Sequence, residues 1–438
     1  MNLIPIIMFG ALFVLVFAGL PVSFSLIIVA VGFGYTVFGD LIFLQLYGSV
    51  LSTASNFVLA AIPLFILMGA ILERSGIAKR LFQALQLWLG GLPGGLALAT
   101  IAMCAIFAAA SGVVGAVEIV VGLMAIPAMT RAGYKNDLIA GTICGGGSLG
   151  TIIPPSVIVV VYASIAQLSI GTLFAASILP GLLMVAFFVG YILIRSILYP
   201  SDAPPLPAEE RDIPMQAKVK ITLTALLPPL VLIVLVLGSL LAGAASATEA
   251  AAVGAAGTIV LAALFRELTL DVLKSALGVT LKITAMIMLI VTGGTMFTST
   301  FAVTGGGALV RDAVGLIGYG DAGVITFFLA VVFFAGFVLD WVSIVLIFIP
   351  IFTPIIKMTG IDPVWFAMMV LVVIQTSYLT PPMAPSIFYL RSIAPRSMTY
   401  GQMYKGVLPF VAAQMLVLIA IILFPQIATW LPSILVGL

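Results

Sequence analysis

Two stretches, far apart in the chain, interrupt apolar runs that are each long enough to cross a lipid bilayer. Gly145–Ser156 reads GGGSLGTIIPPS, and Gln375–Ser386 reads QTSYLTPPMAPS. In each case small or hydroxyl residues lead to a proline pair, Pro154-Pro155 and Pro381-Pro382. A helix that breaks at membrane depth leaves backbone groups unpaired, and lipid cannot hydrogen-bond them. Such breaks persist where they line a polar or ion-filled cavity, so the two stretches predict the binding site of a transporter.

The rest of the chain has the composition of an all-α polytopic membrane protein. Of its 438 residues, 63% are hydrophobic and only 7% are charged, which is not the composition of a soluble globule. We predict crossings at 3–19, 22–38, 57–72, 137–165, 171–197, 221–241, 246–265, 282–303, 363–390 and 406–424. We expect residues 41–55 to form a moderately polar connector, and 81–89 and 268–281 to form helices at the membrane interface.

The side chains present argue against an enzyme. Histidine is absent, which removes histidine metal ligands, general bases and proton relays together. The two cysteines lie in apolar or glycine-rich segments and are expected to pack rather than to react. The chain has no GxxxxGK[ST] phosphate loop and no basic tract. We therefore predict no catalytic residue, no transition metal, no nucleotide and no nucleic-acid partner.

Two long apolar regions, 92–130 and 322–356, each have room for two helices. Their central connectors, 110–115 and 335–339, contain no charge, proline or polar cluster, whereas a loop that emerges into water is normally more polar. We interpret both regions as re-entrant hairpins whose tips remain inside the protein, since irregular backbone at membrane depth is tolerated only there. Two ordinary spanning helices joined by a tight apolar turn are the alternative.

The basic residues predict the orientation of the chain in the membrane. With the loop that contains Arg74 in the cytoplasm, all Lys and Arg residues except Arg311 and Lys357 fall on the cytoplasmic side. The positive-inside rule favours this arrangement over its inverse. Both termini then face outward.

The two halves of the chain match in register. Ile126-Pro127 corresponds to Ile349-Pro350 at an offset of 223 residues, and after a four-residue insertion the proline pairs correspond at an offset of 227. The number of predicted crossings between the hairpins is odd, which places the hairpins on opposite faces of the membrane. The pattern predicts two inverted-topology repeats, as in many secondary transporters. A chance match of proline pairs in a chain with 25 prolines is the alternative.

Each hairpin tip is expected to meet the helix break that follows it. Carbonyl and hydroxyl oxygens at a break are hard ligands suited to a small cation such as Na⁺, and glycine lets the backbone turn its carbonyls inward. The first candidate Na⁺ site comprises Ser111, Gly112, Gly146, Gly147, Ser148, Gly150 and Pro154, and the second comprises Gly336, Asp340, Thr376, Tyr378, Thr380 and Pro382. The alternative is that these small residues only permit close helix packing.

Three acidic residues lie in apolar surroundings, where an ionisable group is costly and suggests a function. Glu118 and Asp340 lie one position apart in the repeat register and, with Ser111, are candidates for lining a substrate cavity. Either acid would bind a coupling cation or set the charge of the cavity. A hydrogen-bonded strut between hairpin and scaffold is the alternative for each acid. Glu249 follows a turn rich in glycine and alanine, and we expect it to cap a helix N-terminus.

Several motifs together resemble one known family. They are Phe107–Gly112, Ile126–Met129, Arg131–Tyr134 and Gly145–Ser156, with Ile62–Gly69, Ser75–Ile77, Leu92–Leu96, Thr248–Val253 and Tyr378–Pro382. The chain is similar in these motifs to the large, DctM-like membrane subunit of tripartite ATP-independent periplasmic (TRAP) transporters. The motifs run from about residue 20 to residue 410, which is almost the whole chain.

The resemblance implies a Na⁺-coupled importer of small organic anions in the bacterial inner membrane, with an elevator mechanism. It implies two partners, a periplasmic substrate-binding protein and a small four-helix membrane subunit. A moving transport domain would comprise 92–165 and 322–392. The scaffold and arms would comprise 1–91 and 166–321, including a cytoplasmic loop at 200–220, and 393–438 would hold the C-terminal helix.

The resemblance also implies which residues form the sites. The family's two Na⁺ sites would correspond to the two pairs of tip and break, and its substrate contacts to Ser111 and Asp340. Many members have a first tip of the form SGSSAAT, where this chain has Ser111–Val117 with the sequence SGVVGAV, followed by Glu118. Fewer hydroxyls and an added acid mark a different substrate class. A binding-protein-independent, ion-coupled dicarboxylate carrier is the main alternative within transport, and a channel is the alternative outside it.

Overall fold

The chain folds into helices joined by short connections. The computed structural model describes residues 3–111, 114–207, 209, 213–317, 320–381 and 384–435, and all regular elements in these ranges are helical. In the first half they are α1 (Ile4–Phe17), α2 (Val22–Phe38), α3 (Leu41–Ala54), η1 (Phe57–Ala60), α4 (Ala61–Arg74), α5 (Ile77–Leu89), α6 (Gly95–Ser111), α7 (Val114–Arg131), α8 (Asn136–Ser148), η2 (Leu149–Thr151), α9 (Val157–Ala166), α10 (Ile170–Leu198) and η3 (Pro200–Asp202). The second half holds α11 (Met215–Leu241), α12 (Ala247–Leu264), α13 (Leu270–Val303), α14 (Gly306–Ile317), α15 (Gly320–Ala335), α16 (Trp341–Thr359), α17 (Pro363–Leu379), α18 (Pro385–Ile393), α19 (Tyr400–Leu423) and α20 (Gln426–Leu435).

The predicted all-α membrane architecture is confirmed. Among the described residues, seven helices are long and apolar enough to cross a membrane. Six of them coincide with predicted crossings: η1 with α4, α10, α11, α12, α13 and α19. The seventh is α16, which the sequence placed in the second hairpin. The predicted crossings at 137–165 and 363–390 are each interrupted at the expected place.

The structure corrects three expectations about single elements. Residues 41–55, which were expected only as a moderately polar connector, form the helix α3 over Leu41–Ala54. The expected interfacial helix at 268–281 and the crossing at 282–303 are one continuous helix, α13, because no proline or strong turn signal separates them. The helices α14 and α20 were not anticipated. Both are short, and their apolar residues are too few to reveal a crossing.

Both predicted hairpin regions contain two helices that pack against each other, α6 with α7 and α15 with α16. The first limbs, α6 and α15, have 17 and 16 residues. At 1.5 Å per residue such helices are about 25 Å long, shorter than a hydrocarbon core of about 30 Å. Their lengths favour re-entrant hairpins, whereas α16, with 19 residues, is long enough to span.

The order of helices recurs along the chain. The run α5 to α10 and the run α14 to α19 both consist of a short helix, two hairpin limbs, two halves of a broken helix and a long helix. Corresponding helices begin at a nearly constant spacing: α8 begins at Asn136 and α17 at Pro363, 227 residues later. This spacing is what a duplication predicts, and the unanticipated α14 is then the counterpart of α5. The opposite membrane orientation of the two copies remains a prediction.

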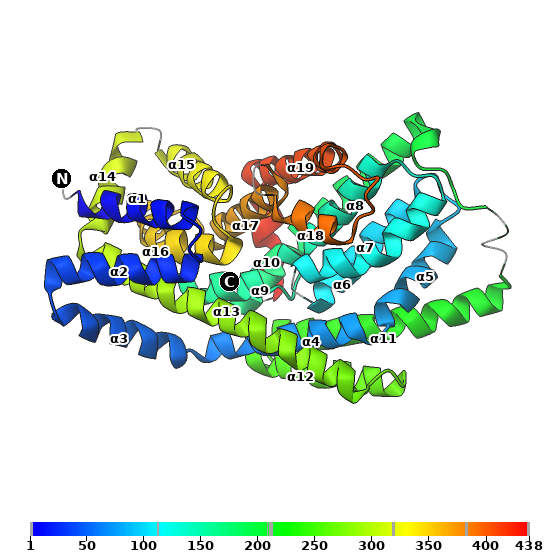
Figure 1. Ribbon diagram of the computed structural model, residues 1–438, viewed down its shortest axis with the longest axis horizontal. Helices are drawn as coiled ribbons and strands as arrows, with labels where there is room; N and C mark the ends of the chain where they lie inside the picture. The colour runs from blue at the N-terminus through cyan, green and yellow to red at the C-terminus, as the bar shows by residue number, and fades with distance from the viewer. Residues whose placement is uncertain are drawn as a thin grey trace.

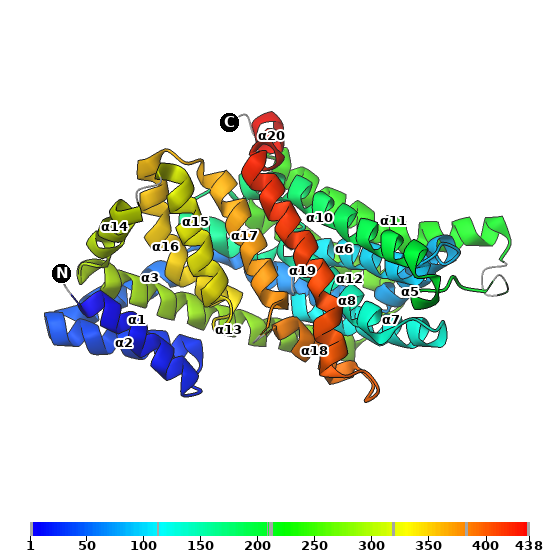
Figure 2. The same cartoon turned by 90° about the horizontal axis from the view of Figure 1, so that it is seen from above.

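Several unbroken helices lie on a different side of the molecule from the hairpins and broken helices, whereas the long helices α10 and α19 pack against the broken helices. In Figure 1 the helices α3, α4, α11, α12 and α13 lie along the lower side, with the hairpins and broken helices above them. Figure 2 shows α19 running across the middle of the molecule beside α17. The second hairpin limbs pack crosswise, α7 against α18 and α16 against α9. Each limb therefore supports the broken helix of the other half.

Candidate functional site

The first helix break lies between α8 and α9 and is buried except at Ile153, which is half-buried. The α-helix ends at Ser148, one 3₁₀ turn follows, and residues 152–156 form no helix before α9 begins. Hydroxyl groups replace some of the lost backbone pairing: Ser148 Oγ donates to the Gly145 carbonyl at 2.7 Å, and Ser156 Oγ donates to the Thr151 carbonyl at 2.9 Å. The Ser148 hydroxyl, which was predicted to bind a cation, thus has a role in stabilising the break itself, as does the Ser156 hydroxyl.

The three glycines before this break allow close packing on three sides. A Cβ atom on Gly145 would overlap the ring of Phe410 in α19, and one on Gly146 would lie 2.7 Å from Cys104 Sγ in α6. A Cβ on Gly147 would lie 2.9 Å from the carboxyl carbon of Glu118 in α7. Close packing, the alternative reading of these residues, is therefore part of their role. Because α6 also packs against η2, the first limb of the first hairpin reaches the first break; Gly112 at the tip lies outside the described residues, and contact between tip and break stays a prediction.

The second break follows α17 and has the same chemistry. Thr376 Oγ1 donates to the Val372 carbonyl at 2.8 Å, and Thr380 Oγ1 donates to the Thr376 carbonyl at 2.7 Å. After the break, Ala384 has a positive φ of 38° immediately before α18 begins at Pro385. An alanine in this conformation is uncommon. The surrounding structure therefore holds the backbone at Ala384 in an uncommon conformation.

The second hairpin contacts the second break through its turn. Gly336 packs so closely on Ser377 at the end of α17 that a Cβ at position 336 would overlap the serine side chain. Asp340 is the N-cap of α16: its Oδ2 accepts from the backbone N–H of Val342 at 3.0 Å and of Ser343 at 3.4 Å, and its Oδ1 accepts from the Ser343 hydroxyl. Asp340 thus has a structural role at the start of α16.

A polar group joins the two breaks at the centre of the protein. Ser148 Oγ accepts from Gln375 Nε2 at 3.1 Å and from Gln414 Nε2 at 3.0 Å. All three side chains are 0% exposed, and the carbonyl oxygens of both glutamines have no hydrogen-bond partner. Ser148 and Gln375 are 227 residues apart, which is the offset of the two halves. Corresponding residues of two copies related by a two-fold axis meet only near that axis, so this contact fits a pseudo-two-fold arrangement.

Glu118 forms a second buried polar group close to both breaks. It is 0% exposed, and its Oε1 accepts from Ser386 Oγ of α18 at 2.6 Å, while its Oε2 has no hydrogen-bond partner. The Tyr378 phenol at the end of α17 lies against the same carboxyl group. The structure therefore brings Glu118 together with Gly147 of the first break and with Tyr378 of the second.

The remaining predicted residues are placed as follows. Gly150 and Pro154 lie in the buried first break. Ser111 is the last residue of α6. Gly112 and Pro382 lie outside the described residues. Glu249 forms a capping box with Ser246 at the start of α12, which confirms the capping role expected for it.

Sequence reasoning missed Gln414, Ser386 and Tyr389 of this centre, and it assigned no site role to Gln375, although Gln375 begins the second stretch. The first was detectable in principle, because Gln414 is a lone amide within the apolar run of α19. Ser386 and Tyr389 follow the second proline pair, and only the packing of α18 on α7 shows that they face Glu118 and Gly115.

The described residues contain no group of three or more His, Cys, Asp or Glu that would hold a transition metal. The oxygens at this centre are hydroxyl, amide, carbonyl and carboxylate groups, the type that Na⁺ prefers.

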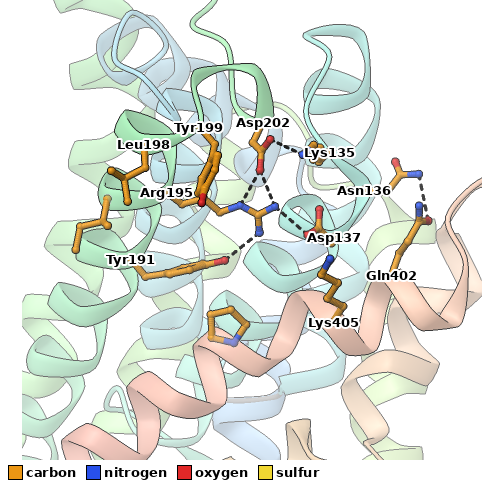
Figure 3. A pocket seen from close by; sticks show the side chains of 12 residues that line it. Lys135, Asn136, Asp137, Tyr191, Arg195, Leu198, Tyr199, Asp202, Gln402 and Lys405 are labelled. Carbon is orange, nitrogen blue, oxygen red and sulfur yellow. Dashed lines mark hydrogen bonds and ion pairs between the residues drawn. The ribbon is translucent and has the colours of Figure 1, made fainter.

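A separate charged cavity of about 770 Å³ lies between the ends of α8, α10 and α19. Figure 3 shows the guanidinium of Arg195 between two carboxylates: it contacts Asp137 at 2.8 Å and Asp202 at 2.9 Å. Lys135 pairs with Asp202 at 2.7 Å. Burial by itself raises the pKa of the Asp202 carboxyl, but the hydrogen bonds from Lys135 and Arg195 outweigh it and lower the pKa below its usual value. Ion pairing therefore fixes η3 against α8.

Replacing Asp202 with asparagine is expected to lower the free energy of unfolding by about 1–3 kcal/mol at pH 7, because charge-assisted hydrogen bonds to Arg195 and Lys135 are lost. Since the carboxyl pKa is lower in the folded state, its stabilisation is complete above the unfolded value near 4 and is lost as the pH falls through the folded value. Unfolding in detergent at pH 7, 5 and 3 measures this: the difference from wild type should hold at pH 5 and shrink at pH 3.

The matched control is Glu267→Gln, which removes an exposed ion pair with Arg80. It should cost less than about 1 kcal/mol at every pH. If both variants lost the same free energy of unfolding, the buried network around Arg195 would stabilise the protein no more than an exposed ion pair does.

Comparison with known proteins gives matches over nearly the whole chain. The family described as "Tripartite ATP-independent periplasmic transporter, DctM component" matches residues 9–427. A C4-dicarboxylate TRAP transporter large permease protein from Pseudomonas aeruginosa is 32% identical over 87% of this chain and 87% of its own length. An ectoine/5-hydroxyectoine TRAP transporter large permease protein from Ruegeria pomeroyi is 32% identical over 97% of each chain. Among solved structures, the Neisseria gonorrhoeae MtrF efflux pump is similar in fold, with a TM-score of 0.64 and 16% identity over 87% of this chain and 83% of that one.

Proposed function

The chain belongs to the DctM component family of tripartite ATP-independent periplasmic transporters, and from this premise we propose that it is a Na⁺-coupled importer of small organic acids. It is a multi-pass transporter permease of the bacterial inner membrane. Its relatives are transporter permeases, which points away from enzymatic activity. The substrates in the names of these relatives differ, a C4-dicarboxylate in one case and ectoine or 5-hydroxyectoine in the other, so the family alone leaves the substrate of this chain open.

The observation that carries the proposal is the buried polar centre between the two breaks. Helix ends, hydroxyls and unpaired amide oxygens lie there at full burial, where their desolvation is costly. Cations and a substrate would supply the missing partners. Coupling follows when Na⁺ and substrate both bind the closed state, in which tips and breaks are in contact, better than the open state.

We propose that the moving part of an elevator comprises the hairpins and the broken helices. The expected boundaries were 92–165 and 322–392. The helices α10 and α19 pack against the broken helices, and α19 contributes Gln414 to the polar centre. We therefore include α10 and α19 in the moving part. The scaffold would then consist mainly of α2, α3, α4, α11, α12 and α13, which pack against one another.

The proposed partners are a periplasmic substrate-binding protein and a small four-helix membrane subunit, as the word tripartite in the family's description suggests. The exposed apolar residues of α1 and α3, such as Phe17, Leu41 and Leu44, offer surface for lipid or for that subunit. A binding-protein-independent dicarboxylate carrier is the second candidate. Uptake by this chain without either partner would favour it.

Removing the Na⁺ gradient is expected to abolish accumulation of substrate, because the ions would supply the driving force. The measurement is uptake of radiolabelled succinate and glycine betaine into proteoliposomes that contain the chain and its two partners. External Na⁺ is compared with external K⁺ and with equal Na⁺ on both sides. Accumulation in K⁺, or with no Na⁺ gradient, would contradict coupling to Na⁺ whichever compound is transported.

A further inference from the structure

Acidic and aromatic side chains converge between the two breaks, and they come from three different helices. Glu118 lies on α7, Tyr378 at the end of α17, and Ser386 and Tyr389 on α18. The Tyr389 ring packs on the first hairpin, since a Cβ on Gly115 would lie 2.8 Å from its Cζ. Gly115 and Glu118 are three residues apart on α7, and Ser386 and Tyr389 are three residues apart on α18, so the Tyr389 ring belongs to the same helix contact as the Glu118 carboxyl group.

This group of side chains contains acidic groups that no basic side chain pairs with. Within the described part of the chain, the ion pairs of Lys and Arg involve other acids, and none reaches Glu118 or Asp340. Asp340 is satisfied by the start of α16. Glu118 is not: its Oε2 is buried and has no partner. A buried carboxylate with an unused oxygen is costly unless a positive group completes it.

The aromatic rings make the missing group more specific. The π-face of tyrosine attracts organic cations, and cages of aromatic and acidic side chains bind substituted ammonium groups. A dicarboxylate would instead bring a second carboxylate against Glu118, an acid with which no Lys or Arg of the described residues forms an ion pair. Glu118 is also one of the differences between this chain and the hydroxyl-rich first tip that many members of the family have.

We propose that this acidic and aromatic group, Glu118 with Tyr378, Tyr389 and Ser386, binds the positively charged nitrogen of a zwitterionic carboxylate, and that it selects such substrates over dicarboxylates. The proposal rests on the proposed transport function and names the substrate class of the same site. The Glu118 Oε2 contacts the cationic group, Ser386 holds Oε1 and thereby orients the carboxylate, and the tyrosine rings cover the cation. The carboxylate of the substrate faces away from Glu118.

The sign of the local potential is tested first, with thiol reagents of opposite charge. Tyr389 is 43% exposed, and the native Cys104 and Cys144 are both buried. In Tyr389→Cys, we compare the rate of reaction with a trimethylammonium methanethiosulfonate with the rate for its sulfonate counterpart. The ratio of these two rates should be at least about tenfold higher than the same ratio for a free thiol in solution. Adding Glu118→Gln should remove most of that preference. A preference that is absent, or that is unchanged by Glu118→Gln, overturns the proposal.

The ligand class is tested with an isosteric pair that differs only in charge. Glycine betaine carries a trimethylammonium group where 3,3-dimethylbutanoate carries a tert-butyl group. In purified chain with Na⁺ present, glycine betaine should raise the thermal unfolding temperature, whereas 3,3-dimethylbutanoate and succinate should not. Glu118→Gln, which keeps an acceptor for Ser386, should fold and lose the response to glycine betaine. Stabilisation by succinate, or no stabilisation by glycine betaine, overturns the proposal.

Two further results separate this inference from the transport function on which it rests. If proteoliposomes take up succinate in a Na⁺-dependent manner, the transport function stands and the substrate class is wrong. If Glu118→Gln fails to fold, Glu118→Asp is used: it keeps the charge but shortens the side chain, and it should retain the preference for the cationic reagent. If Glu118→Gln instead abolishes stabilisation by Na⁺ alone, Glu118 binds the coupling ion, and the proposal is overturned.

Discussion

Replacing Gly406 with valine is expected to prevent the chain from folding, because at this position α19 touches the backbone of α8. A Cβ on Gly406 would lie 2.9 Å from the carbonyl carbon of Asp137 and 3.0 Å from the backbone nitrogen of Gly141. Backbone atoms cannot move aside as the end of a side chain does, so the two helices would have to separate. We expect the variant to lose more than about 3 kcal/mol of stability and to give little monodisperse protein after extraction in detergent.

Gly401 on the same helix provides a matched control. A Cβ at position 401 would meet nothing closer than Thr399 Oγ1 at 4.0 Å. Gly401→Val should therefore be extracted and purified like the wild type. Normal yield of Gly406→Val would show that α8 and α19 are not in fixed contact, and it would remove Gln414 from the centre described above.

Replacing Gly336 with alanine is expected to reduce Na⁺-dependent uptake at least about tenfold, while the chain still inserts in the membrane. The added methyl group would overlap the Ser377 side chain, so the second hairpin could no longer close on the end of α17. Small misplacements near a site commonly cost this much in rate. The measurement is proteoliposome uptake at matched protein content, together with the rise in unfolding temperature on adding Na⁺.

The clash at Gly336 involves a side chain, so it can be relieved. In Gly336→Ala combined with Ser377→Gly the space is restored, and uptake should recover well above the product of the two single effects. Gly307→Ala, where a Cβ meets nothing within 4 Å, should leave uptake unchanged. If Gly336→Ala alone transports normally, closure of this hairpin on α17 is not part of the mechanism.

Patterns along the sequence were enough to predict much of the fold. The apolar runs located most of the long helices, and the paired prolines located both breaks, because a proline pair and a hydrophobic run act on the backbone of their own segment. The match between Pro154-Pro155 and Pro381-Pro382 also predicted the 227-residue spacing between α8 and α17. Errors arose where no local signal existed. Nothing in the sequence marks α13 as one helix rather than two, and α14 is too short to show as a crossing.

The candidate site was predictable only in part. The glycines and hydroxyls of each break were identified because their composition is unusual within an apolar run. The roles of these residues could not be predicted, because turning backbone carbonyls inward, allowing close helix packing and binding a cation all use the same residue types. Glu118 stood out as an acid among apolar residues. Its contacts with Ser386 and Tyr378 depend on helices of the other half of the chain, more than 200 residues away, and its contact with Gly147 depends on how α7 packs on α8.

The sequence by itself determined that this is an all-helical membrane protein, where its helices break, and that the two halves share one pattern. These properties depend on interactions with lipid and on backbone chemistry, which each segment experiences locally. Only the tertiary structure decided that Ser148 meets Gln375 and Gln414, that Asp340 caps α16, and that Glu118 faces the opposite half of the chain with one oxygen unpaired. Which polar groups share a buried space depends on how helices pack, and packing is set by the whole chain at once.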